Sequence, residues 1–387
     1  MSHTGPALPP GRVEGLDAWR AALMVGGVLL HASSWLDTRP MFEAVALVSH
    51  TVRMGAFFAI SGFVAARALA GRSPATWLRR RLGQIGPPTL FGLGVLCPLV
   101  TAIVAALPGA QATVWFAWYH LWFLVALLLY APLAATVATA DPGPWRGLAR
   151  RYGGAGVSPA PLLAATALLS LLCLLTTSLA IGAVGTHATM PFLIGVRSIA
   201  SYWPDYPFGF VVARSAAIQA VVLRSARWPM ILLGGIAGVY AAWFLLLGSA
   251  CAPATRTWGD GLLPLLSEAI APPAAFVLML RSSARIRRII PAARSLADAS
   301  FTIYILHVPV IAALTLATAR AGWTVEARYG VIVVATLVLA HAFHHACVRR
   351  SAWLSLIFCG QATMPRAGGP GSPWPGAVAV AAVSRRR

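Results

Sequence analysis

Charged residues are scarce in this sequence. Only 10% of its 387 residues are charged and 58% are hydrophobic, and the mean hydropathy is +0.75. A soluble domain has about 25% charged residues, so the composition excludes a large soluble fold. Apolar runs of about 20 residues recur along the chain, and each is long enough to cross a hydrocarbon core of about 30 Å. The runs are continuous rather than alternating, so the sequence predicts an all-α, polytopic helical bundle in a lipid bilayer.

Lysine is absent, and all 30 basic residues are arginine against 10 acidic residues. A net charge of +20 is also typical of nucleic-acid-binding proteins. Here the arginines lie between apolar runs and not on one soluble basic face, so we exclude a nucleic-acid partner.

The sequence also lacks the usual signs of a metal, disulfide or exported protein. Its five cysteines form no CxxC pair and lie mostly in apolar runs, where we expect small buried side chains. The first 15 residues are polar and proline-rich, and no cleavage site of small residues follows a short apolar core. We therefore expect the first apolar segment to be a retained helix and not a removed signal peptide.

Ten membrane spans are predicted: roughly 17–37, 44–70, 85–107, 115–138, 161–184, 202–223, 228–248, 259–281, 299–319 and 328–348. Under strict alternation, 22 arginines then fall on the side of the N-terminus and five on the opposite side. This bias places both termini in the cytoplasm. We expect three parts: a cytoplasmic segment 1–16, a membrane domain 17–348, and a basic, disordered tail 349–387 attracted to anionic lipid.

The first span carries the ionisable residues Asp17, Arg20 and His31 in its sequence, before Asp37 at its end. An ionisable group at membrane depth is costly and is by default a candidate functional residue. Arg20 and His31 are 11 positions apart, so they share a helix face and lie about 16 Å apart along the axis, while Asp17 is placed to pair with Arg20. The alternatives are a core histidine bonded to a neighbouring helix and an arginine that snorkels to the surface.

The second span contains His50 and Arg53 on one face, followed by Ser61 and Gly62. Arg53 is predicted at the depth of His31, and the short outer loop makes the two helices neighbours. An arginine side chain that faces lipid is energetically unfavourable, so Arg53 must point into the bundle, toward a carboxylate or an anionic ligand. Ser61 and Gly62 permit either close helix packing or access to a cavity.

Four arginines lie in the loop and helix start that follow, namely Arg72, Arg79, Arg80 and Arg81. The excess of arginine that is usual in cytoplasmic loops explains part of this cluster. A phosphate-rich ligand also suits it, because arginine binds phosphate bidentately.

Further polar residues lie in later spans. His120 stands among aromatic residues at the outer end of the fourth span, and Tyr304 and His307 share a face of the ninth. His341 and His344 have a spacing that suits a metal, but no carboxylate accompanies them, and we predict no metal site.

Taken together, these motifs resemble the acyltransferase family 3 membrane proteins. The resemblance rests on Leu16-Asp17-x-x-Arg20 followed by His31, on Phe57-Phe58-x-Ile60-Ser61-Gly62-Phe63, on the arginine cluster before Pro87-Pro88, and on Tyr304-Ile305-Leu306-His307-x-Pro309. Within the family, His50-x-x-Arg53-Met54 and His120-Leu121-Trp122-Phe123-Leu124 look most like the glucan biosynthesis protein C branch, which is linked to glucan succinylation. One departure is Gln84, where the family often has a second arginine three positions after Arg81.

The resemblance implies transfer of an acetyl or succinyl group from cytoplasmic acyl-CoA to a hydroxyl of an envelope or periplasmic carbohydrate, in the bacterial inner membrane. It implies no bound cofactor. Expected roles are catalysis for His31, Arg20 and Arg53; donor binding for Arg72, Arg79, Arg80 and Arg81; and substrate binding for Asp17, His50, Ser61, His120, Tyr304 and His307. His31 acts as a general base or as a transient acyl carrier. The alternatives are a transporter or flippase of an acyl or glycan intermediate, and a structural or sensor protein.

Overall fold

The computed structural model consists of helices, and the part of the chain that it describes contains no strand. The described residues are 14–36, 39–107, 117–139, 147, 150–151, 158–186, 189–224, 226–243, 253–286 and 290–361. The predicted all-α class is confirmed.

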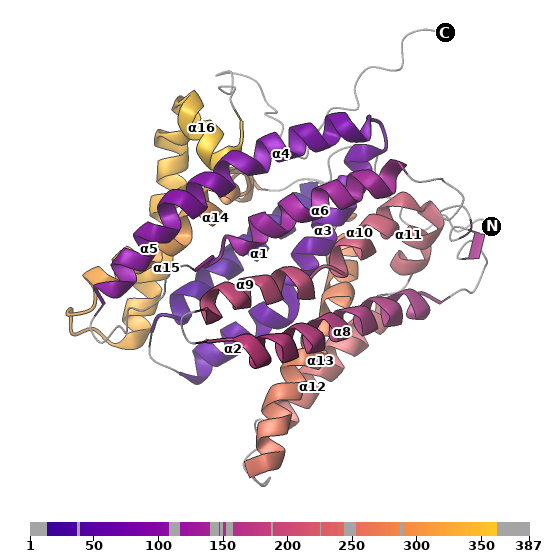
Figure 1. Cartoon of the computed structure of the whole chain (residues 1–387), viewed down its shortest axis with the longest axis horizontal. Coiled ribbons are helices and arrows are strands. Elements are labelled where there is room, and N and C mark those ends of the chain that lie inside the picture. The colour runs from indigo at the N-terminus through magenta and orange to yellow at the C-terminus, as the bar shows by residue number, and fades with distance from the viewer. Residues whose placement is uncertain are drawn as a thin grey trace.

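Figure 1 shows the helices in their order along the chain. Their bounds are α1 Glu14–Ser33, α2 Pro40–Val48, η1 Ser49–Arg53, α3 Met54–Leu69, α4 Pro74–Phe91, η2 Gly92–Leu96, α5 Cys97–Ala105, α6 Trp122–Thr139, α8 Ala160–Val184, α9 Met190–Ser201, α10 Asp205–Arg214, α11 Ala216–Leu223, α12 Arg227–Ala242, α13 Pro253–Ser283, α14 Pro291–Ala317, α15 Val325–Ala346, η4 Val348–Arg350 and α16 Ala352–Cys359.

Local sequence explains where several helices begin. Proline stands at the start of α2, α4 and α14, where its fixed φ suits the first turn and its missing N–H costs nothing. The side chains of Ser215, Thr324 and Ser351 accept a hydrogen bond from a backbone N–H in the first turn of α11, α15 and α16. These caps satisfy donors that the helix itself leaves without partners.

Seven segments among the described residues are long and apolar enough to cross a membrane, or eight if one bent pair is a single span. The chain is therefore a multi-pass membrane protein. The expected count of ten is not confirmed. Helix α1, which carries the four ionisable residues Glu14, Asp17, Arg20 and His31, and the 16-residue α12 are not among the seven. The segment 190–223 is broken by a bend of 108°.

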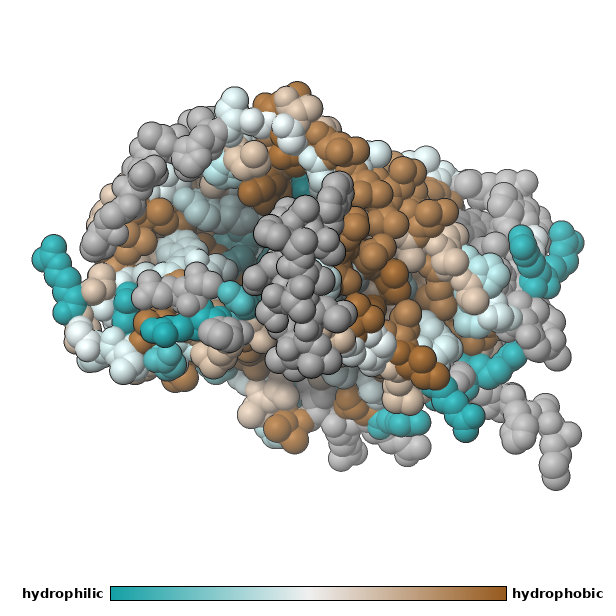
Figure 2. All heavy atoms as spheres, turned by 90° about the horizontal axis from the view of Figure 1, so that it is seen from below, coloured by the Kyte–Doolittle hydropathy of each residue, from teal (hydrophilic) through white to brown (hydrophobic). Residues whose placement is uncertain are grey.

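The helices α4, α6, α9 and α8 lie side by side in one layer, each contacting the next (Figure 1). Behind them α3 packs on α10, and α14 packs on α1 and α15. Figure 2 shows hydrophobic residues gathered over the middle of one face and hydrophilic residues toward its two ends. This distribution suits a bundle whose middle lies in hydrocarbon and whose ends meet water.

Helices α3 and α10 are in close backbone contact. A Cβ atom on Gly62 would lie 1.9 Å from the carbonyl oxygen of Tyr206, and one on Gly209 would lie 1.8 Å from that of Ala59. The two backbones therefore touch where side chains are missing, as small residues permit in membrane helix pairs. Of the two alternatives for Ser61-Gly62, the structure has close helix packing, and Ser61 is buried within it.

The ordered chain continues past residue 348, where we expected the membrane domain to end. Helix α16 follows and packs on α4. Gly360 ends it with a φ of +65°, and a Cβ there would lie 1.7 Å from the carbonyl oxygen of Gln84. Only glycine fits this left-handed close approach. Residues 1–13 and 362–387 of the expected terminal segments lie outside the described residues.

Candidate active site

Three histidines meet in the interior: His31 from α1, His120 from the turn before α6 and His307 from α14. The ring centroids of His31 and His307 are 5.1 Å apart, those of His120 and His307 are 4.5 Å apart, and those of His31 and His120 are 6.2 Å apart. His120 and His307 are buried and His31 is half-buried. The sequence proposed these residues separately, and the fold brings them together.

Hydrogen bonds fix the orientation of two cluster members. His307 Nδ1 lies 2.7 Å from the carbonyl oxygen of Tyr304. A carbonyl only accepts, so Nδ1 carries the proton and Nε2 is left as the basic nitrogen. That Nε2 is buried and has no hydrogen-bond partner among the described residues. The Tyr304 hydroxyl donates to the carbonyl oxygen of His120 at 2.5 Å.

Arg53 lies beside the histidine cluster at the end of the π-helical turn η1. Its Nε donates a 2.7 Å hydrogen bond to Ser49 Oγ. A Cβ atom on Gly27 of α1 would lie 3.0 Å from Arg53 Nη1 and 4.0 Å from His307 Nε2. The guanidinium therefore faces α1 one turn before His31. A π turn inserts one extra residue and changes the direction of the side chains that follow.

A small pocket opens between α1, α3, α4, α6, α14 and α16, with a cavity volume of about 30 Å³. Its polar wall includes Arg20, Arg81 and Gln84, and its apolar wall includes Met24, Phe57, Phe123 and Leu127. Arg20 Nη1 lies 3.9 Å from Asp17 Oδ1, so the predicted pair forms. The Arg20 guanidinium also lies over the Phe57 ring, 5.7 Å from its centroid.

The structure divides the arginine cluster. Arg81 is half-buried and lines the pocket, whereas Arg79 and Arg80 are exposed on other faces of α4. Arg72 is half-buried in the turn before α4, and it does not line this pocket. Because Arg81 and Gln84 are three residues apart, both point into the pocket. The glutamine thus stands on the wall where the resembling family often has a second arginine.

The predicted residues therefore separate into two groups. His31, Arg53, His120, Tyr304 and His307 form one group, which we call the histidine cluster. Arg20 and Arg81 form the second group at the pocket. Two other predicted residues lie apart: His50 is exposed on η1, and Ser61 lies in the packed core of α3.

Two buried carboxylates escaped the sequence analysis. Glu268 Oε2 lies 3.7 Å from Arg197 Nη2, and Arg197 Nε donates to Ser178 Oγ at 3.0 Å. Asp205 is 1% exposed, and both of its carboxylate oxygens have no hydrogen-bond partner among the described residues. Asp205 lies inside the sixth predicted span and Glu268 inside the eighth, so the cost of ionisable groups at membrane depth was a usable signal for both.

The histidines near the end of α15 bond to hydroxyl groups. Ser295 Oγ lies 2.9 Å from His341 Nε2 and 3.0 Å from His345 Nε2, and Thr302 Oγ1 lies 2.8 Å from His344 Nδ1. No group of three or more potential metal ligands occurs in the described part of the chain. These contacts join α15 to α14.

The fold and the site define a class of protein: a multi-pass membrane protein with two polar sites in its interior. One site is the histidine cluster with Arg53, and the other is the pocket with Arg20 and Arg81. The family model described as "Acyltransferase domain" (Acyl_transf_3) matches residues 13–345. The chain belongs to this acyltransferase 3 family, and it is accordingly assigned as a membrane acyltransferase. No curated protein and no solved structure matches the chain.

Proposed function

We propose that this protein transfers an acyl group from acyl-CoA to a hydroxyl of an envelope carbohydrate. The observation that carries the proposal is the placement of two polar sites along one helix. Arg20 lies on the pocket wall and His31 lies in the histidine cluster. Eleven residues of helix separate them by roughly 16 Å. A donor with a phosphate-bearing end and a reactive thioester end suits such a pair of sites.

The pocket is the proposed site for the phosphates of the donor. Arg20 and Arg81 supply two guanidinium groups from different helices to one opening. Guanidinium groups bind phosphate through paired charge-assisted hydrogen bonds. Gln84 adds an amide that donates and accepts hydrogen bonds but carries no charge. Arg79, Arg80 and Arg72 supply positive potential outside the pocket and favour orientation with the arginine-rich ends in the cytoplasm.

The histidine cluster is the proposed site of transfer. His31 takes the proton of the acceptor hydroxyl, and the oxygen attacks the thioester carbonyl. The tetrahedral oxyanion develops beside the Arg53 guanidinium, which stabilises its charge. The carbon–sulfur bond then breaks, and the thiol leaves with the proton that His31 returns. The His307 and His120 rings lie beside His31, and the Arg53 guanidinium lies next to His307.

The finer assignments follow the family branch that the motifs resemble. We propose an acetyl or succinyl donor, a periplasmic glucan or a related glycan as acceptor, and the bacterial inner membrane as location, with both termini cytoplasmic. No bound cofactor is required, because the donor brings its own activated thioester.

The test is a transfer assay with purified protein in lipid nanodiscs. Acetyl-CoA or succinyl-CoA with a labelled acyl group is mixed with an extract of envelope glycans, and the label is followed by mass spectrometry. Acylated glycan with release of the CoA thiol is the expected result, and label that stays on His31 after brief mixing identifies the covalent route. Binding and release of unchanged donor, or of unchanged glycan, supports a transporter and overturns the proposal.

A further inference from the structure

The pocket around Arg20 and Arg81, the proposed donor pocket, is not lined by any histidine of the histidine cluster. Met24 is the last residue of α1 that lines the pocket, seven residues before His31. At 1.5 Å per residue this leaves roughly 10 Å of helix between the end of the pocket and the proposed base. A thioester bound through Arg20 and Arg81 must cross this interval before it reacts.

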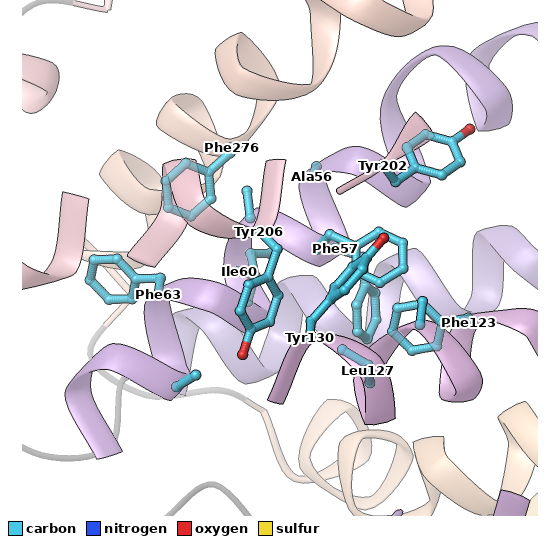
Figure 3. Packing of buried hydrophobic residues seen from close by; sticks show 14 of the residues in the cluster. Ala56, Phe57, Ile60, Phe63, Phe123, Leu127, Tyr130, Tyr202, Tyr206 and Phe276 are labelled. Atoms are coloured by element: carbon cyan, nitrogen blue, oxygen red, sulfur yellow. The ribbon is translucent and has the colours of Figure 1, made fainter. Parts of the chain in front are cut away.

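Aromatic rings fill the interval. Phe57 and Phe123 both line the pocket, and their ring centroids are 4.8 Å apart in an edge-to-face contact. Phe123 also contacts the Tyr304 ring at 5.6 Å, and the Tyr304 ring lies 5.1 Å from that of His120. Phe123 therefore touches the pocket on one side and the histidine cluster on the other, and Phe301 of α14, which also lines the pocket, contacts Tyr304 less closely, at 6.3 Å. Figure 3 shows Phe57, Phe123 and Leu127 grouped together in this part of the core.

The backbone beside Phe123 is strained. Tyr119, four residues earlier, has a φ of +46°, and it is the one non-glycine residue with a positive φ among those that the structure describes. This conformation costs roughly 1–2 kcal/mol for a residue with a Cβ atom. Hydrogen bonds hold the segment in place, among them one between the Tyr119 hydroxyl and Thr101 Oγ1 at 2.9 Å and one from the Tyr304 hydroxyl to the carbonyl of His120. The turn before α6 is thus a local element with strain to release when it moves.

We propose that Phe123 is a movable barrier between the donor pocket and the histidine cluster, and that it selects which acyl groups reach His31. The inference rests on the proposed function. In the closed position the ring ends the pocket and keeps water that enters beside Arg81 away from the histidines. A short acyl group needs a small displacement of the ring to pass, whereas a long one needs the whole ring to move.

The barrier makes two predictions about a Phe123→Ala variant. The transfer rate of larger acyl groups rises relative to that of acetyl, because the volume that the ring occupied becomes available to them. Hydrolysis of the donor in the absence of acceptor also rises, because water adds to the thioester carbonyl at the histidines and the carbon–sulfur bond breaks to give carboxylic acid and CoA thiol. Both effects are read from thiol release with acetyl-CoA, succinyl-CoA and octanoyl-CoA.

Phe58→Ala is the matched control. Phe58 neighbours Phe123 at 4.9 Å and is fully buried, but it does not line the pocket. Both variants remove a buried phenyl ring and loosen the same core. We expect the octanoyl-to-acetyl rate ratio to rise at least about tenfold in Phe123→Ala, or 1.36 kcal/mol in barrier, and to stay unchanged in Phe58→Ala. Equal changes in the two variants, or no change in Phe123→Ala, would overturn the proposal.

A second experiment needs no acyl transfer. A cysteine is placed at the buried position His307 in a chain whose five native cysteines are replaced, and a membrane-impermeant methanethiosulfonate reagent is added to sealed vesicles from one side at a time. Arg79→Cys, on the exposed face of α4, identifies the pocket side. With Phe123 present, the cysteine stays unlabelled from that side; with Phe123→Ala it is labelled, and with Phe58→Ala it is not.

These readouts separate the barrier from the proposed function. Labelling through an opened Phe123 position supports the barrier even if the donor is not acyl-CoA. Labelling that is equal with and without the Phe123 ring rejects the barrier and leaves the proposed function standing. A transfer assay without product rejects the proposed function and leaves the labelling result to decide the barrier alone.

Discussion

The Tyr304 hydroxyl donates a hydrogen bond to the carbonyl oxygen of His120, 2.5 Å away and 184 positions earlier in the chain. This bond ties α14 to the turn before α6, and the two residues also have rings in edge-to-face contact. Tyr304 thereby holds the position of His120 while its own carbonyl fixes the tautomer of His307. One tyrosine orients two members of the histidine cluster.

Tyr304→Phe tests this arrangement. The variant keeps the ring but leaves the buried His120 carbonyl without its donor, which costs about 1–3 kcal/mol. We expect kcat to fall about tenfold as the cluster loosens, with KM for the donor unchanged because the pocket is separate. Steady-state kinetics check the split. A loss confined to KM would contradict the role assigned to the bond.

His31→Ala is expected to abolish transfer while membrane insertion and donor binding stay normal. Removal of the base leaves nothing at this position to take the hydroxyl proton. Thiol release from acetyl-CoA with acceptor gives the rate, and binding of labelled CoA in nanodiscs gives the affinity. Stable protein with the wild-type transfer rate would show that His31 has no catalytic part.

Arg81→Ala is expected to weaken donor binding, and Arg79→Ala serves as its matched control two residues earlier on the same helix. Arg81 lines the pocket and Arg79 is exposed. Loss of one charge-assisted hydrogen-bond pair corresponds to about 1.5–3 kcal/mol, or roughly tenfold to a hundredfold in Kd for CoA. Binding measured by equilibrium dialysis at fixed salt checks this. Similar losses in both variants would mean that general positive charge, and not a built site, attracts the donor.

Gly62→Ala is expected to destabilise the bundle without touching either site. The new Cβ would lie 1.9 Å from the Tyr206 carbonyl oxygen, so α3 and α10 must separate. Overpacking of this kind costs about 1–3 kcal/mol or more. A lower midpoint of thermal unfolding in detergent is the readout. Gly234→Ala on α12 is the control, because its Cβ would meet nothing within 4 Å, and a matching loss there would contradict the explanation.

Some of the site could be predicted because two of its determinants are properties of single helices: the helical period and the free-energy cost of an ionisable group in the membrane. Helical spacing alone put Arg20 and His31 on one face, and the expense of an intramembrane arginine turned Arg53 inward to the depth of His31. The pairing of Asp17 with Arg20 followed from a separation of three residues. Glu268 was open to the same reasoning, since it too lies within a predicted span.

The number of spans was less predictable. Hydropathy does not reveal whether a helix with several ionisable residues, such as α1, packs among other membrane helices. It also does not reveal whether an apolar run such as 190–223 crosses the membrane straight or bends by 108°. Helix α16 was also missed as a packed element, because its eight residues gain stability from α4 and from the Gly360 close approach rather than from their own length.

The sequence by itself determined that this chain is a helical membrane protein and that its first two spans place His31 and Arg53 at one depth, because hydrophobic length and helical period are properties of single segments. Only the tertiary structure decided that His120 and His307 join them, that Arg81 and not Arg79 reaches the pocket, and that Phe123 stands between the two sites. These are contacts between helices far apart in the chain, and the direction of each side chain is settled by the packing of its helix against the others.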